Sequence, residues 1–307
     1  MESLIKTSGK TNHAAVVIGG VNMDIGGRIS GCMVMRDSNP GVISTRPGGV
    51  GRNIAHNLRL LGLDVSLIAA VGGDMHAQAI LRSCSELGID MSMARILPEE
   101  RSSTYLYVTD ESGDMQLGIS DMDIVQKIDV PYLEKHIDAI NRFDAVVLDA
   151  NLSVESIEYL AARCTRPMYA DSVSTVKTMR LMGVLDRLSA IKPNGIEAQA
   201  MTGAADMEEA AQLLLEKGVK RVFITLGAGG ILAAEGGQLV RLPCESAPVI
   251  NTTGAGDSAT AAIVWAGMKG LSLEATAAAA IKAGAITCQS EDANCEELAT
   301  LPGLMGY

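Results

Sequence analysis

The stretch "GGVGRNIAHNLRLLGLDVSLIAAVGGD" (residues 48–74) decides the fold. A glycine turn opens a helical pattern in which Ile54 and Leu58 recur at helical spacing, and Gly62 ends the pattern. The apolar, β-branched run "VSLIAAVG" (65–72) follows directly and predicts a buried strand. A helix that leads straight into a buried strand is the repeating unit of parallel α/β sheets.

The same alternation runs through the rest of the chain. The segment "MHAQAILRSCSELGID" (75–90) repeats the helix-then-strand order, and helical patterns such as "MEEAAQLLLEKGV" (207–219) separate the later apolar runs. Short apolar runs that predict further strands occupy residues 14–25, 144–150, 167–172, 189–194 and 221–227. This order predicts an α/β fold of three layers, an α/β/α sandwich whose mostly parallel sheet is covered by helices on both faces.

Two segments interrupt the alternation. Residues from about 26–46 and about 101–121 carry shorter, alternating, β-branched patterns with turn residues such as "DESGD" (110–114). We expect inserted antiparallel strands there, which form a small β-sheet lid. Because the chain has no low-complexity linker and no internal repeat, residues 1–307 are predicted to form a single domain that carries this lid.

The composition narrows the classes of function. The net charge is −11 and no lysine- or arginine-rich run occurs, which argues against a nucleic-acid partner. The six cysteines include no CxxC pair, so a zinc ribbon or a dense disulfide scaffold is not expected. No signal-peptide pattern and no apolar run of about 18 residues is present. We therefore expect a cytoplasmic protein that binds a small molecule, without a membrane partner.

The late turn "TTGAGD" (252–257) is the first of the motifs that point to chemistry. Asp257 stands in the first turn of a predicted helix, directly behind two glycines. Free N–H groups and the positive end of the helix dipole attract negative charge at such a place. The turn can therefore hold a developing anion beside Asp257 acting as a base. Alternatively, Asp257 only complements the helix dipole, and the spacing alone does not separate the two explanations.

Two early motifs point to a hydroxyl-bearing ligand. The turn "PGGVGRN" (47–53) lacks the full GxGxxG spacing, which argues against a dinucleotide dehydrogenase, but its glycines let Asn53 approach a sugar hydroxyl. Asn22 and Asp24 follow the first predicted strand and lie two residues apart, so both can face the same hydroxyls. A plain tight turn and a solvated strand-end aspartate are the alternatives.

Two further motifs suit a nucleotide. Asn194 and Glu197 of "KPNGIE" (192–197) lie on one face of an opening helix and can hold a hydrated Mg²⁺ ion, although a helix cap explains them equally well. Thr225 and the glycines of "TLGAGG" (225–230) can line phosphates or simply form a turn between strands. Walker A, protein-kinase and GxSxG signatures are absent from the sequence.

In chain order, these motifs resemble the ribokinase-like, PfkB-type carbohydrate kinase family over residues from about 14–298. Within the family, the "SNPG" stretch before the early glycine turn and the late signature that starts with Asn251 are most similar to pseudouridine kinases. The resemblance implies ATP-dependent phosphorylation of the 5′-hydroxyl of pseudouridine. Another sugar or nucleoside kinase, such as a ribose, adenosine or inosine kinase, stays open, as does a non-catalytic ligand-binding module on the same fold.

The resemblance also implies roles for individual residues. Asp257 would be the general base, beside an anion hole formed by its own N–H group and those of Gly254, Ala255 and Gly256. The residues implied to hold ATP and Mg²⁺ are Asn194, Glu197, Thr225, Gly227 and Gly229, with Glu197 acting on the metal through water. The residues implied to hold the ribose hydroxyls are Asn22, Asp24, Gly48, Gly49 and Asn53. Because they lie in or beside the inserted strands, we expect Ser38, Asn39 and Thr104 to contact the base.

Relatives often bind a monovalent cation such as K⁺ beside the anion hole. The matching positions are Asn251, the carbonyl of Thr253, Ala285, Ser290 and Asn294. Asn251 stands where an aspartate is commoner, and this loss of negative charge leaves the K⁺ dependence open. The apolar segment "CMVM" (32–35) lies in the predicted lid and favours a homodimer formed through the lid.

Overall fold

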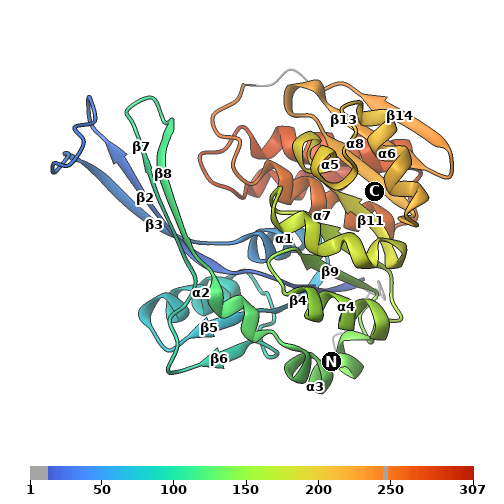
Figure 1. Ribbon diagram of the computed structural model, residues 1–307, viewed down its shortest axis with the longest axis horizontal. Helices are drawn as coiled ribbons and strands as arrows, with labels where there is room; N and C mark the ends of the chain where they lie inside the picture. Colours follow the sequence, from blue (N-terminus) through green and yellow to red (C-terminus); the bar gives the residue numbers. More distant parts are fainter. Residues whose placement is uncertain (1–12, 245–247) are drawn as a thin grey trace, which may run out of the picture.

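The computed structural model describes residues 13–244 and 248–307 and shows a large sheet between two layers of helices, with a smaller sheet projecting from one side (Figure 1). The large sheet has eight strands in the order β14-β13-β12-β11-β10-β9-β1-β4. In chain order, its strands are β1 (Ala14–Ile18), β4 (Asp64–Ile68), β9 (Ala145–Asp149), β10 (Met168–Asp171), β11 (Leu188–Lys192), β12 (Arg221–Thr225), β13 (Ile231–Glu235) and β14 (Gln238–Leu242).

Neighbours from β4 to β12 pair in parallel, whereas β13 and β14 are antiparallel. The edge is antiparallel because its connections are short. Only a few residues join β12 to β13 and β13 to β14, and a parallel pair requires a much longer crossover connection. The predicted, mostly parallel sheet is thus confirmed.

The two faces of the large sheet have separate hydrophobic cores, as the pleat of a doubly covered strand requires. In β1, Ala15 and Val17 belong to one core, and Val16 and Ile18 belong to the other. The helices that cover the first face are α1 (Val50–Leu60), α2 (Met75–Glu86), α7 (Ala255–Met268), α8 (Leu273–Thr287) and α9 (Leu301–Leu304). The helices on the second face are α3 (Val130–Ile140), α4 (Val154–Arg163), α5 (Gly195–Thr202) and α6 (Met207–Glu216).

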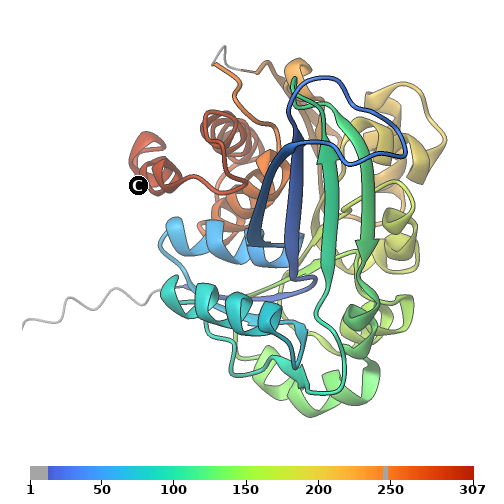
Figure 2. The ribbon, with the colours of Figure 1, turned by 90° about the vertical axis from the view of Figure 1, so that its left-hand side faces the viewer.

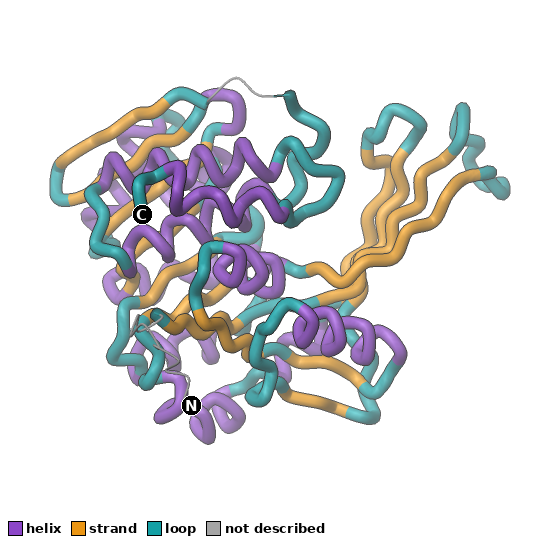
Figure 3. Tube along the Cα trace, turned by 180° about the vertical axis from the view of Figure 1, so that it is seen from behind, coloured by secondary structure: helices purple, strands orange, loops and turns teal. Residues whose placement is uncertain are grey.

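The smaller sheet is the predicted lid. Its four strands have the order β3-β2-β7-β8. They are β2 (Asn22–Ile29), β3 (Gly41–Gly48), β7 (Thr104–Thr109) and β8 (Met115–Asp121). Figure 2 looks onto these strands, which run side by side in front of the main body, and Figure 3 shows them from behind, projecting away from the helices.

Three details differ from the expectation. The run 14–25 holds two strands, because the chain turns at Gly19, where an added Cβ would lie 2.4 Å from Oδ2 of Asp149, and β2 of the lid already begins at Asn22. The run 65–72 also divides, into β4 and β5 (Ala70–Gly72), and β5 pairs with β6 (Arg95–Leu97). Finally, the two antiparallel hairpins of the lid join through a parallel pair, β2 with β7.

The two faces of the lid differ in chemistry. Asp24 is in register with Arg46 and with Tyr105, so these side chains share one face. This face points toward the C-terminal part of the chain, because Arg46 forms an ion pair with Asp292. The apolar segment at 32–35 lies in the exposed loop between β2 and β3 rather than in a strand. In residues 13–244 and 248–307, no helix combines the length and apolar character needed to span a membrane.

Candidate active site

Helix α7 begins at the late glycine turn, as predicted. Gly254 precedes its first residue with a φ of 80°, and an added Cβ there would lie 1.9 Å from the carbonyl oxygen of Ala293. Only glycine fits this close approach, and the turn delivers the chain into the helix at Ala255. The N–H groups of a first helical turn have no acceptor within the helix, although that of Ala255 makes a long contact of 3.3 Å to Thr252 O. The predicted anion hole therefore has donors at the start of α7.

Asp257 follows in the same turn and is half-buried. Burial raises the pKa of its carboxyl group, and the negative charge of Asp171 raises it further. A hydrogen bond of 2.9 Å from Nδ2 of Asn53 to Oδ2 of Asp257 and the positive charge of Lys192 act in the opposite direction. The resulting pKa is about 7. A carboxylate with this pKa is a competent general base near neutral pH.

A buried charged group lies beside the start of α7. Nζ of Lys192 is 3.2 Å from Oδ2 of Asp171, and the hydroxyl of Thr260 donates to the same oxygen at 2.6 Å. An added Cβ on Gly256 would lie 3.1 Å from Nζ of Lys192, which places the ammonium group directly beside the helix start. Burial lowers the pKa of Lys192, but the charges of Asp171, Glu197 and Asp257 outweigh burial and raise it above its ordinary value.

Asp171 and Lys192 are not among the residues predicted to act in the site, although the sequence carries a signal for them. Asp149, Asp171 and Lys192 are the last residues of the neighbouring strands β9, β10 and β11. In open parallel sheets, ligands bind beyond the carboxyl ends of the strands. Three charged residues at the ends of adjacent strands therefore mark this edge of the sheet as the site.

A pocket of about 650 Å³ adjoins the start of α7. Its polar residues, which carry an amine, an amide, hydroxyls or exposed backbone, are Lys192, Asn194, Thr225, Gly227, Thr252 and Gly256. The rest of its wall is mainly apolar and includes Ile231, Val249, Ala259, Ala280, Ile281 and Cys288. The pocket thus gathers six predicted residues from distant parts of the chain, namely Asn194, Thr225, Gly227, Ala255, Gly256 and Ala285. A cationic end and an apolar wall suit a ligand that is anionic at one end and has an aromatic or apolar group at the other.

Asn194 and Glu197 form a capping box at the start of α5, so the helix-cap explanation is correct for both side chains. Oε2 of Glu197 also accepts a 2.5 Å hydrogen bond from Ser172 Oγ. Neither Glu197 nor Gly229 lines the pocket itself. In the described ranges 13–244 and 248–307, no three His, Cys, Asp or Glu side chains form a group that can hold a metal ion. A Mg²⁺ ion near Glu197 would thus take most of its ligands from water and from a bound phosphate, which fits its usual coordination.

The residues predicted to hold a sugar lie together at the root of the lid. Nδ2 of Asn22 donates to Oδ1 of Asp24 at 2.5 Å. An added Cβ at Gly48 would lie 2.0 Å from Oδ2 of Asp24, and one at Gly49 would lie 2.7 Å from Gly20 O. Gly49 also has a φ of 100°. The glycines therefore make room for the carboxylate and the turn, and Asn53 in the next turn joins this group to Asp257.

Of the residues expected to contact a base, the structure brings Thr104 close to this group, in register with Met23, but not Ser38 or Asn39. Ser38 is exposed in the loop at the tip of the lid. The side chain of Asn39 closes that same loop, with Oδ1 accepting from Val34 N at 2.7 Å and Nδ2 donating to Val34 O at 2.9 Å. Thr104 lies at the root of β7, where its Oγ1 is 3.4 Å from Nδ1 of His76.

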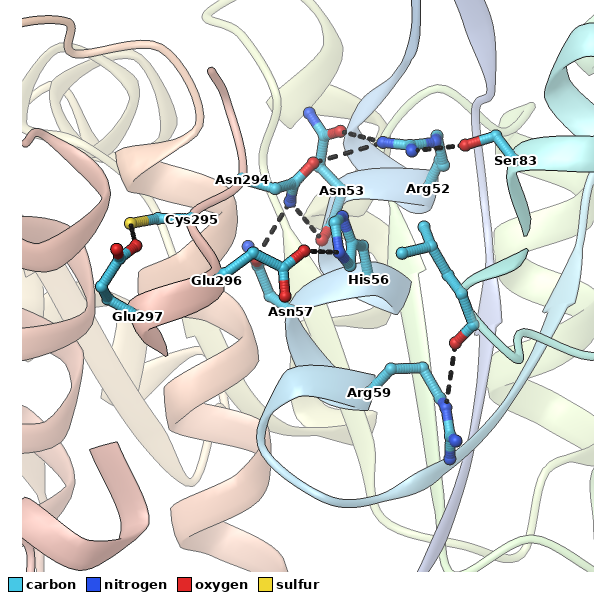
Figure 4. A network of polar contacts seen from close by, with 11 residues as sticks. Arg52, Asn53, His56, Asn57, Arg59, Ser83, Asn294, Cys295, Glu296 and Glu297 are labelled. Carbon is cyan, nitrogen blue, oxygen red and sulfur yellow. Dashed lines mark hydrogen bonds and ion pairs between the residues drawn. The ribbon is translucent and has the colours of Figure 1, made fainter. Parts of the chain in front are cut away.

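The side chains predicted for a monovalent cation make hydrogen bonds within the protein. Oδ1 of Asn251 accepts from Thr253 N at 3.0 Å, and Ser290 Oγ accepts from Asp292 N at 3.1 Å. Ala285 lines the large pocket. Asn294 turns toward helix α1 and contacts Arg52, Asn53 and Asn57 (Figure 4).

Comparison with known proteins gives a consistent picture. Residues 12–298 match the family model described as pfkB family carbohydrate kinase. The pseudouridine kinase of Escherichia coli (strain K12) is 34% identical over 266 residues, which cover 83% of this chain and 84% of that protein. The guanosine-inosine kinase of Exiguobacterium acetylicum is 27% identical and covers 87% of this chain and 90% of its own length. The Arabidopsis thaliana ribokinase solved with ribose and ATP has the same fold, with a TM-score of 0.82, 20% identity and coverage of 96% and 99% of the two chains.

Proposed function

The chain belongs to the pfkB family of carbohydrate kinases and is a sugar or nucleoside kinase with a hydroxyl acceptor, and on this premise we propose that it phosphorylates pseudouridine. The reaction transfers the γ-phosphoryl group of ATP to the 5′-hydroxyl of the nucleoside and gives pseudouridine 5′-phosphate and ADP. A reaction that consumes ATP is expected in the cytoplasm.

The observation that carries the kinase chemistry is the position of Asp257 between Asn53 and the start of α7. In the proposed reaction, the Asp257 carboxylate takes the proton of the 5′-hydroxyl while that oxygen forms a bond to the γ-phosphorus and the bond to the ADP oxygen breaks. The N–H groups of the first turn of α7 stabilise the charge on the transferred group. Lys192 lies beside the same helix start and adds a positive charge.

The large pocket fits the nucleotide, with phosphates at its polar end near Asn194, Thr225 and Gly227 and adenine against the apolar wall. Mg²⁺, when bound with ATP, would neutralise phosphate charge, and Glu197 would orient it through water. Positions 251, 253, 285, 290 and 294 remain our proposal for a K⁺ site. Replacing K⁺ by Na⁺ in the assay tests it, and an unchanged rate would refute a functional site there.

A nucleoside is favoured over a free sugar by the inner face of the lid. Tyr105 and Tyr107 are stacked there, with ring centroids 5.7 Å apart and an interplanar angle of 29°. An added Cβ at Gly26 would lie 2.6 Å from the Tyr107 hydroxyl, so the glycine lets this ring lie flat across the sheet. Because Tyr105 is in register with Asp24, a ribose held at Asp24 would carry its base toward these rings. In place of Ser38 and Asn39, we therefore propose Tyr105 and Tyr107 as the residues that contact the base.

The choice of pseudouridine rests on the "SNPG" stretch and on the similarity to the Escherichia coli pseudouridine kinase. The similarity to a guanosine-inosine kinase keeps a purine nucleoside as the second candidate. An ATP-coupled assay with pseudouridine, uridine, inosine, guanosine, ribose and fructose 6-phosphate separates them. We expect the highest kcat/KM with pseudouridine, and efficient turnover of ribose or inosine without turnover of pseudouridine would refute the proposal.

The outer face of the lid supports a homodimer. Ile43, Leu117 and Ile119 lie on this face and are 77%, 50% and 55% exposed. An apolar sheet face of this kind is commonly covered by another chain, and a second copy presents a matching face. Light scattering at micromolar concentration tests this, and Leu117→Lys should shift the protein to a monomer. A monomeric wild type would refute the dimer.

A further inference from the structure

Arg52 is a buried arginine, and within residues 13–244 and 248–307 no carboxylate is in hydrogen-bond contact with it. It lies in the first turns of α1 and is 7% exposed. Its guanidinium group donates to Asn53 Oδ1 at 3.4 Å, Asn294 Oδ1 at 3.2 Å and Ser83 Oγ at 2.8 Å, all of which are neutral oxygens. Its Nε is buried without a partner in the described part of the chain, and burial lowers the pKa of Arg52. A buried guanidinium group whose hydrogen-bond partners are all neutral lowers the stability of the fold, which indicates that Arg52 has a role other than packing.

The three acceptors come from three segments that are far apart in the sequence (Figure 4). Asn53 is the next residue of α1, Ser83 belongs to α2, and Asn294 lies in the loop after α8. Asn294 also contacts Asn53 directly, because its Nδ2 donates to Asn53 O at 3.2 Å. The same Nδ2 donates to Asn57 Oδ1 at 2.9 Å. Arg52 and Asn294 together therefore fix both the backbone and the side chain of Asn53.

The fixed side chain has a direct connection to Asp257. A guanidinium group only donates hydrogen bonds, and a carboxylate only accepts them. The Asn53 amide lies between the two, so only one of its two orientations satisfies both neighbours, with Oδ1 toward Arg52 and Nδ2 toward Asp257. Without Arg52, the amide could turn over and place its oxygen against the carboxylate, where the two acceptors repel each other.

We propose that Arg52 is a positioning residue for phosphoryl transfer, which holds the Asn53 amide so that it donates to the Asp257 carboxylate. The inference rests on the proposed role of Asp257 as the general base. Arg52 itself contacts neither the substrate nor the transferred group in this account. It acts only through Asn53.

The proposal makes a statement about pH. The groups that face Asp257 are Asn53 from α1, Asp149 from β9, Asp171 from β10 and Lys192 from β11. Of these, the Asn53 amide is the one that Arg52 controls, and its hydrogen bond lowers the pKa of Asp257. Loss of Arg52 should therefore raise that pKa and move the activity to higher pH, whereas a purely structural loss would lower the rate equally at every pH.

The test compares single-turnover phosphoryl transfer at saturating Mg·ATP and pseudouridine in three variants, Arg52→Met, Asn53→Ala and the double variant, between about pH 5.5 and 9.5. For Arg52→Met, we expect a rate about fivefold lower near pH 7, with the acidic limb of the pH–rate profile moved up by about one pH unit and recovery toward pH 9. The acidic limb of the double variant should coincide with that of Asn53→Ala, because Arg52 acts through Asn53. Three results would each overturn the proposal: pH shifts of the two single variants that add up in the double variant, a rate of Arg52→Met that is lowered equally at all pH values, or an acidic limb of Arg52→Met that does not move.

Arg59→Met is the matched control on the same helix. The Arg59 guanidinium donates to Leu63 O, Leu87 O and Asp64 Oδ1, at 2.6, 3.4 and 3.1 Å. Figure 4 shows Arg59 on the same helix as Asn53, with no bond between the two. Its pH profile should match the wild type. If Arg52→Met does not fold, Ser83→Ala removes the shortest bond to the guanidinium and should move the limb in the same direction by less, and an unmoved limb there counts against the proposal. The variant Asp257→Asn separates a failure of the proposed function from a failure of this proposal. Full activity in that variant would refute the role of Asp257 as the general base, and it would say nothing against the hydrogen bonds by which Arg52 and Asn294 hold Asn53.

Discussion

Asn53 and Asp257 are 204 residues apart in the sequence, and the Nδ2 amide of one lies 2.9 Å from the Oδ2 carboxylate oxygen of the other. This bond joins the early glycine turn, which opens α1, to the late glycine turn, which opens α7. The residues predicted to hold the sugar, at the root of the lid, and the N–H groups at the start of α7 therefore meet at one carboxyl group.

The first prediction concerns the pH dependence of catalysis. Burial and the charge of Asp171 raise the pKa of Asp257 to about 7, and only the carboxylate form can accept a proton. The single-turnover rate should rise about tenfold per pH unit below the pKa and level off above about pH 8. Rates measured at saturating Mg·ATP between about pH 5.5 and 9 check this. A flat profile across that range would contradict the assignment of the base.

The second prediction concerns stability. A carboxyl group with a higher pKa in the folded state than its ordinary value of 3.8 binds more protons when folded. The free energy of unfolding therefore falls as the pH rises from about 4 to above 7. Asp257→Asn removes this titration, so near pH 8 the variant should melt about 2–4 °C above the wild type, and the difference should shrink toward pH 5. Thermal unfolding of both proteins at pH 5 and pH 8 measures this difference in melting temperature. If Asp257→Asn were less stable than the wild type at pH 8, the buried charge of Asp257 would not destabilise the folded state, and the prediction would be wrong.

The third prediction concerns Gly254. Its φ of 80° and the close approach of Ala293 O leave no room for a side chain. Gly254→Ala should lower the free energy of unfolding by about 2–4 kcal/mol and should also displace the donors of the anion hole, which reduces kcat. Gly303→Ala is the control, since an added Cβ there meets nothing within 4 Å. Denaturant unfolding and kcat of both variants provide the comparison, and equal behaviour of the two would contradict the steric argument.

The fourth prediction concerns the tyrosine pair of the lid. If the base stacks on Tyr105 and Tyr107, replacing either by alanine should raise KM for pseudouridine about tenfold or more, because stacking contributes about 1–3 kcal/mol per base. Tyr105→Phe keeps the ring and should retain most of the affinity. Steady-state kinetics with pseudouridine decide it. An unchanged KM in Tyr105→Ala and Tyr107→Ala would place the base elsewhere.

Much of the fold follows from local patterns. Strands such as Ala145–Asp149 are buried on both faces and read as continuous apolar runs, and the helices between them have helical spacing. The glycine turns before α1 and α7 were also predictable, because a glycine turn that enters a helix has a clear pattern. The sequence did not reveal that the run 14–25 breaks at Gly19, since the break depends on the approach of Asp149 from a distant strand.

The site was predictable in part, for a related reason. Single residues such as Asp257 and Asn53 could be chosen from their motifs, but their partners depend on which segments the fold brings together. Thr260 and Asp171 are 89 residues apart and share a 2.6 Å hydrogen bond that no local pattern indicates. Arg52 had no local signal either, because its partners Ser83 and Asn294 lie in other elements.

The fifth prediction, which tests the central claim, concerns the rate of phosphoryl transfer in Asp257→Asn. The amide is similar in size to the carboxyl group but cannot take the proton from the 5′-hydroxyl. The single-turnover rate with pseudouridine and Mg·ATP should fall by about 10³-fold, while ATP binding, measured by calorimetry, should change by about twofold or less. A folded Asp257→Asn protein that transfers the phosphoryl group at a rate near that of the wild type would contradict the account.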